Sequence, residues 1–94
     1  SFGPLLAVIP FNIDVQTILP IIGELRRQGK RVELELRGRK IGKAMGWADS
    51  IGADYTLVVG PRDLESGTGM LKSLKTGEQV AVALSSIEIA ASLN

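Results

Sequence analysis

Three runs of residues predict strands from the spacing of their apolar positions. Residues 5–9 and 55–59 contain no charged side chain, which is typical of strands covered on both faces in a parallel sheet. Residues 31–37 alternate between apolar and charged side chains. This period of two predicts a strand with one packed face and one solvated face, at or near a sheet edge.

Helical spacing separates these strands. Apolar positions recur every three or four residues across 15–25 and again across 41–51, and a glycine follows each run. Asn12 and Asp14 are both suitable N-caps for the first helix. Pro20 removes a backbone donor within it, so the sequence predicts either a kink or a later helix start.

The order of these elements predicts the topology. Strand, helix, strand, helix and strand with right-handed crossovers give a parallel unit in which the first strand is central. Residues 62–69 are polar and glycine-rich, and we interpret them as a linker. Two strands at 70–74 and 79–84 predict a hairpin, and Ser85 or Ser86 caps a last short helix. The prediction is a three-layer α/β domain, in which the parallel unit and the hairpin form one mixed sheet flanked by about three helices.

The composition removes several classes of chemistry. The 94 residues, which make one domain spanning residues 1–94, contain no cysteine and no histidine. Disulfides, thiolate zinc sites, histidine-ligated metals and Ser-His-Asp triads are therefore excluded. Apolar runs stay well below the roughly 18 residues of a membrane span. We expect a cytoplasmic, monomeric domain that folds without metal or cofactor.

Basic residues are concentrated in one part of the sequence. Residues 26–43 hold eight of the eleven basic residues and two of the ten acidic ones, a net charge of +6, whereas the rest carries −5. A fold that keeps these positions together has a cationic face, which suits a polyanion such as nucleic acid. The alternative is a solvated surface on which the charges scatter in three dimensions.

The second predicted helix places an aromatic ring among cations. At about 100° per residue, Arg39, Lys40, Lys43 and Trp47 form a continuous band beside the apolar stripe. Cations bind phosphates, and an aromatic ring can stack on an unpaired base. Trp47 can equally cover the margin of the core. On the opposite flank, two glycines four residues apart leave room for another backbone or for a ligand.

Further polar residues follow the predicted parallel strands. Ligands of open α/β sheets collect beyond the carboxyl ends of such strands. Here those ends carry Asn12, Arg37, Arg39, Arg62 and Asp63. Their side chains can hydrogen-bond the edges of bases as well as phosphates.

Two other patterns are interpreted as structural. The glycine-rich residues 38–43 resemble a phosphate loop, but they are one residue short and lack the Ser or Thr after the lysine. Glu33 and Glu35 share the solvated face of the alternating strand with Arg31 and Arg37. We expect these charges to pair across that face, and we assign no catalytic residue and no metal ligand.

Four stretches carry a family resemblance. They are GKRVELELRGRKIGK at 29–43, ADSIGADYTLVVG at 48–60, DLESG at 63–67 and KTGEQ at 75–79. Together they resemble the C-terminal anticodon-binding domain of class IIa aminoacyl-tRNA synthetases, and the histidyl branch is the most similar. The resemblance implies a mixed five-stranded sheet flanked by helices, which agrees with the elements predicted above.

The resemblance also implies contacts with unstacked anticodon bases, at Gly38, Arg39, Lys43, Gly46, Asp63 and Lys72. Gly46 stands where relatives often carry a cation, and Pro20 interrupts a helix that is normally continuous. The candidate RNA-binding residues from all of these arguments are Asn12, Arg37, Gly38, Arg39, Lys40, Lys43, Gly46, Trp47, Arg62, Asp63 and Lys72.

The implied function is to bind the tRNA anticodon loop on behalf of a histidine–tRNA ligase. The partners are then tRNA and a catalytic domain outside these residues, which attaches histidine with ATP and Mg²⁺. The 94 residues themselves are not expected to be catalytic. One alternative is an accessory protein that reuses the domain to bind proteins or other nucleic acids. A flavodoxin-like small-ligand domain is disfavoured by the missing phosphate loop.

Overall fold

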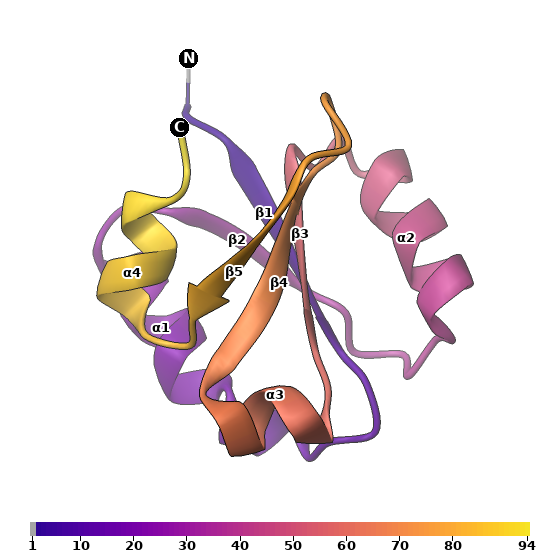
Figure 1. Cartoon of the computed structure of the whole chain (residues 1–94). Coiled ribbons are helices and arrows are strands. Elements are labelled where there is room, and N and C mark those ends of the chain that lie inside the picture. The colour runs from indigo at the N-terminus through magenta and orange to yellow at the C-terminus, as the bar shows by residue number, and fades with distance from the viewer. Residues whose placement is uncertain (1) are drawn as a thin grey trace.

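The two uncharged apolar runs form the parallel centre of the sheet. In the computed structural model, which describes residues 2–94, β1 (Leu5–Pro10) pairs in parallel with β2 (Arg31–Leu34) and with β3 (Tyr55–Val59). Residues 5–9 are all buried because β1 has a neighbour on each side and helices over both faces. The predicted central position of the first strand is confirmed (Figure 1).

The predicted hairpin extends this sheet beyond β3. β4 (Thr68–Ser73) pairs antiparallel with β3, and β5 (Gln79–Ala83) pairs antiparallel with β4. The strand order is β2-β1-β3-β4-β5, so β2 and β5 are the edges. The mixed five-stranded sheet is therefore confirmed.

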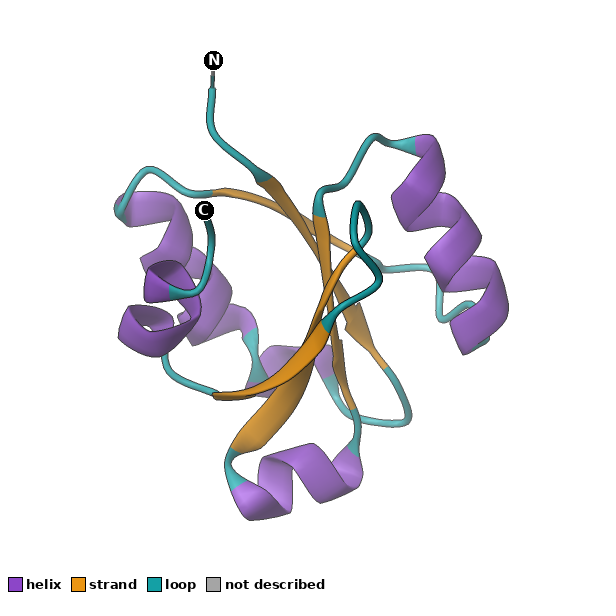
Figure 2. Cartoon of the chain, turned by 45° about the horizontal axis from the view of Figure 1, so that its top comes forward, coloured by secondary structure: helices purple, strands orange, loops and turns teal. Residues whose placement is uncertain are grey.

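Helices cover the two faces unequally (Figure 2). α1 (Leu19–Arg27) and α4 (Ser86–Ala91) lie over one face, where they close the main core around side chains such as Leu6, Leu25 and Ile89. α2 (Ile41–Ser50) lies over the other face, on a small cluster of Leu5, Ala7, Ala48 and Ala53. The predicted three-layer arrangement is confirmed.

The first helix starts late, as one of the two interpretations of Pro20 required. A 3₁₀ turn, η1 (Val15–Thr17), comes first, and the Asp14 carboxylate accepts the Gln16 N–H at its start. α1 then begins at Leu19 with Pro20 in its first turn, where a missing N–H costs nothing. At the last helix, Ser85 is the N-cap, since its hydroxyl accepts the Glu88 N–H.

The predicted linker at 62–69 is wrong, because it contains a helix and the start of a strand. α3 (Pro61–Ser66) begins directly after β3, and Gly67, in the left-handed region at φ 75°, ends it. Six residues are too few to display helical periodicity, and Pro61 resembles a strand terminator as much as a first helical residue. Residues 2–94 therefore contain four α-helices rather than three.

None of the helices described between residues 2 and 94 has the length and apolar character needed to cross a bilayer. Within the same residues, no three acidic side chains gather as potential metal ligands.

Candidate nucleic-acid interface

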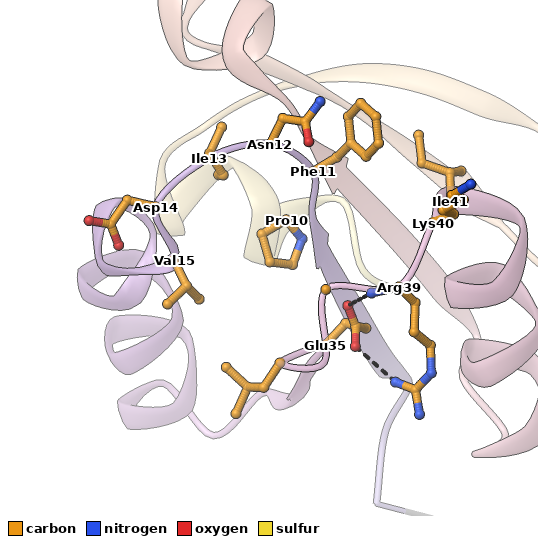
Figure 3. Close-up of a pocket in the computed structure, with 12 residues that line it drawn as sticks. Pro10, Phe11, Asn12, Ile13, Asp14, Val15, Glu35, Arg39, Lys40 and Ile41 are labelled. Atoms are coloured by element: carbon orange, nitrogen blue, oxygen red, sulfur yellow. Dashed lines mark hydrogen bonds and ion pairs between the residues drawn. The ribbon is translucent and has the colours of Figure 1, made fainter.

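A cavity of about 870 Å³ opens at the carboxyl ends of β1 and β2. Residues 10–15 form one side of it, and Glu35, Leu36 and residues 38–41 form the other (Figure 3). Four of the candidate residues line it: Asn12, Gly38, Arg39 and Lys40. The sheet thus brings two of the predicted carboxyl-end groups, Asn12 and Arg39, to one hollow, which we call the carboxyl-end cavity. The other three, Arg37, Arg62 and Asp63, do not line it.

Local backbone geometry holds the first wall of the cavity in place. The Phe11 N–H donates to the Val59 carbonyl (2.9 Å), which ties the loop after β1 to β3. Asn12 then turns the chain with φ 55°, a left-handed conformation that asparagine tolerates better than most residues. Its side chain is exposed at the rim of the cavity and is available to a ligand.

The alternating pattern at 31–37 is misleading beyond Leu34, where the strand ends. Glu35 does not share a solvated face with Glu33, because its side chain is completely buried. Leu36, predicted to face the core, is 71% exposed at the cavity. The expected pairing of Glu35 on a solvated strand with Arg31 and Arg37 is therefore wrong.

The Glu35 carboxylate replaces the hydrogen bonds that the strand loses. The backbone N–H groups of Arg37 and Arg39 donate to its two oxygens (2.6 Å and 3.1 Å). The Arg39 guanidinium also donates to Oε1 (2.8 Å), which forms an ion pair. Charge-assisted bonds of this kind are the stronger class, so Glu35 fixes the shape of residues 35–39.

Arg39 connects the cavity to the only tryptophan of the chain. Its guanidinium carbon lies 5.7 Å from the centre of the Trp47 ring, within the range of a cation–π contact. Arg37 and Lys40 are exposed, and no acid in residues 2–94 pairs with either. Arg37 and Lys40 are therefore unpaired cations close in sequence to Arg39, which Glu35 and Trp47 hold in place.

One of the two interpretations of Trp47, that it covers the margin of the core, is confirmed. Trp47 packs against the small cluster under α2, so it covers the margin of the core. The ring is nevertheless only partly buried and lines a groove. On the other flank of the helix, a Cβ added at Gly42 or Gly46 would meet no atom within 4 Å, so no backbone of residues 2–94 packs there.

The remaining candidates lie outside the cavity. Lys43 and Gly46 are exposed on α2. Lys72 pairs with Thr56, and Thr56 pairs with Ala7, so Lys72 projects from the sheet face that α2 covers. Arg62 is exposed on α3.

Asp63 has a structural role at the start of α3. Its Oδ2 accepts the N–H of Gly60, the N-cap residue (2.7 Å), and this closes the first turn of the helix. The other carboxylate oxygen has no bond to a residue in 2–94. The half-buried side chain can therefore cap the helix and still accept a bond from a ligand.

Sequence patterns missed the apolar part of the cavity. Phe11, Ile13, Leu36 and Ile41 line it between the polar groups. Leu36 and Ile41 are among the large apolar side chains left exposed by the fold, and exposed apolar groups beside a hollow mark a binding surface. In the sequence, these residues were visible only as apolar positions at the ends of predicted helices and strands.

Comparison with known proteins assigns the family. Residues 6–90 match the model of the family described as the anticodon binding domain. The chain belongs to the anticodon-binding domain family.

The relatives of this anticodon-binding domain are synthetases. The histidine–tRNA ligase of Pyrococcus horikoshii is 38% identical over 85 residues, which are 90% of this chain and 20% of that protein. The histidine–tRNA ligase of Mycolicibacterium vanbaalenii is 41% identical over 80 residues, which are 84% of this chain and 19% of that protein. The chain thus spans about a fifth of the length of these curated relatives.

Solved structures agree with the anticodon-binding fold. The apo histidyl-tRNA synthetase of S. aureus superposes with a TM-score of 0.85 over all of this chain and 27% of that one, at 23% identity. The histidyl-tRNA synthetase of Nostoc sp. PCC 7120 superposes with a TM-score of 0.74 over 85% of this chain and 19% of that one, at 30% identity.

Proposed function

We propose that this anticodon-binding domain binds the anticodon loop of histidine tRNA as part of a histidine–tRNA ligase. The family match over residues 6–90 is the observation that carries the proposal. The cavity supports it, because the unpaired Lys40 lies there beside exposed apolar side chains, and an anticodon loop offers both phosphates and unstacked bases.

Some residues of the site position the RNA loop, and others recognise its bases. Arg37, Lys40 and Lys43 neutralise phosphates, which positions the loop without reading its sequence. An unstacked base enters the cavity against the apolar wall. The Asn12 amide and the free oxygen of Asp63 then hydrogen-bond base edges, since an amide and a carboxylate have complementary donors and acceptors for them.

The rest of the reaction belongs to residues outside this chain. A catalytic domain of the parent ligase would bind ATP and Mg²⁺ and attach histidine to the tRNA. Binding of the anticodon here would place the acceptor end of the same tRNA in that distant site. We propose a cytoplasmic location for the parent, where tRNA is charged, and a monomeric state for this domain in isolation.

Asp63→Ala tests base reading by this domain. The free energy of unfolding is expected to fall by about 1 kcal/mol, because the Gly60 N–H loses its acceptor. The preference for an RNA stem–loop with the histidine anticodon over one with an altered anticodon should also narrow, by about 1–3 kcal/mol. Thermal unfolding and titration with the two stem–loops measure these effects.

The matched control is Glu65→Ala, which removes an exposed carboxylate from the same helix and breaks no hydrogen bond in residues 2–94. It should leave stability and anticodon preference unchanged. If Asp63→Ala lowered stability but kept the full anticodon preference, Asp63 would only cap α3 and would read no base.

A further inference from the structure

A second groove follows the free edge of β2, away from the carboxyl-end cavity. Its volume is about 640 Å³. Residues from the end of α1, from β2 and from α2 line it, and β2 is an edge strand of the sheet. Arg26, Lys30, Arg31 and Trp47 line this β2-edge groove, together with Leu5 and Ile51.

The charge of the β2-edge groove is positive and largely unneutralised. The nearby Arg27 is paired with Glu24 (2.9 Å), whose pKa is lowered by the hydrogen bond that Arg27 donates, so this pair stays ionised outside the groove. Lys30 and Arg31 pair with no acid in residues 2–94. Glu33 is the one acidic residue lining the groove, against three basic residues.

Arg26 makes the edge of β2 unsuitable for a further strand. Its guanidinium donates twice to the Val32 carbonyl (2.7 Å and 3.2 Å), on the side of β2 away from β1. An added peptide strand needs that carbonyl as an acceptor. The groove therefore favours a ligand that recognises cations and an aromatic surface rather than one that pairs with the backbone.

Trp47 gives the groove its aromatic surface. The ring rests on the apolar cluster beneath α2, which includes Leu5 and Ala48, so its position is constrained. Arg39 contacts the same ring at 5.7 Å while lining the carboxyl-end cavity. The two hollows therefore adjoin, and a chain of nucleotides leaving one of them can enter the other.

We propose that the β2-edge groove is a second RNA site that extends the anticodon-loop site of the proposed function, on which this inference rests. Lys30 and Arg31 hold backbone phosphates of the strand that continues from the loop, and one unpaired base stacks on Trp47. A groove lined by cations and an aromatic ring is how proteins hold single-stranded nucleic acid without reading its sequence.

The experiment titrates the chain with the anticodon stem–loop of histidine tRNA and follows the fluorescence of Trp47, the only tryptophan. Stacking should quench this fluorescence. Lys30→Gln combined with Arg31→Gln removes two phosphate contacts, each contributing about 0.7 to the slope of log affinity against log salt. Affinity at 0.1 M salt should fall about 25-fold, equally for the histidine and an altered anticodon.

The control variant is Arg27→Gln with Lys75→Gln, which has the same change in net charge at exposed positions outside the groove. It should keep most of the affinity. The inference is overturned if both double variants bind the stem–loop alike, or if Trp47 stays unquenched at saturation. Retained anticodon preference in those cases leaves the proposed function standing, whereas an unmodified chain that binds no stem–loop overturns both.

Discussion

Glu35→Ala should destabilise the domain more than any other single change around the carboxyl-end cavity. The free energy of unfolding is expected to fall by about 3 kcal/mol, since removing one partner of a buried ion pair leaves the other uncompensated. The N–H groups of Arg37 and Arg39 lose their acceptor at the same time. Urea unfolding measures the loss. Because Arg39 keeps 26% of its side chain exposed, water can partly replace the carboxylate, which places the effect at the lower end for buried pairs.

Glu33→Ala is the matched control for this prediction. Glu33 lies two residues earlier, is exposed and accepts no hydrogen bond in residues 2–94. Its replacement should change stability by less than about 0.5 kcal/mol, as most surface substitutions do. Equal stability of the two variants would show that Glu35 does not organise the loop.

Replacing both Lys40 and Lys43 by glutamine should lower RNA affinity as strongly as the Lys30 and Arg31 double variant does. Each exposed lysine is expected to neutralise one phosphate of a single-stranded loop, at about 0.7 per contact in the slope of log affinity against log salt. The slope should fall by about 1.4, which is a loss of about 25-fold in affinity at 0.1 M salt. Titrations of the anticodon stem–loop at several salt concentrations measure both quantities.

The loss should be the same for the histidine anticodon and for an altered one, because phosphates carry no sequence information. The Arg27→Gln and Lys75→Gln variant again controls for net charge. An unchanged salt slope in the Lys40 and Lys43 variant would mean that this flank of α2 faces solvent in the complex.

The parallel half of the fold was predictable because burial on both faces leaves a plain signal. The uncharged run at 5–9 is typical of a strand covered on both faces, and a glycine-containing turn between two short strands predicted the hairpin. α3 was not predictable from periodicity, since its stability depends on a cap by Asp63 and on Leu64, which packs against the main core.

The sequence predicted which charged residues belong to the candidate site, but it did not predict the shape of the cavity. The carboxyl ends of β1 and β2 do bring Asn12, Arg39 and Lys40 to one cavity, as parallel topology requires. Alternation could not reveal that Glu35 turns inward, because the pattern continues for three residues after the strand has ended. Beyond the last hydrogen bond between the strands, the unpaired N–H groups need other acceptors. The conformation there depends on those acceptors and no longer on the spacing of apolar residues.

The central claim is that this domain holds the anticodon loop of histidine tRNA. Mapping the backbone of the complete tRNA with hydroxyl radicals, in the presence and absence of the chain, tests it most directly. The account predicts protection of nucleotides in the anticodon loop and the adjoining strand, with the acceptor stem as reactive as in free tRNA. Protection of the acceptor stem instead, or an anticodon loop that stays fully reactive at saturating protein, would contradict it.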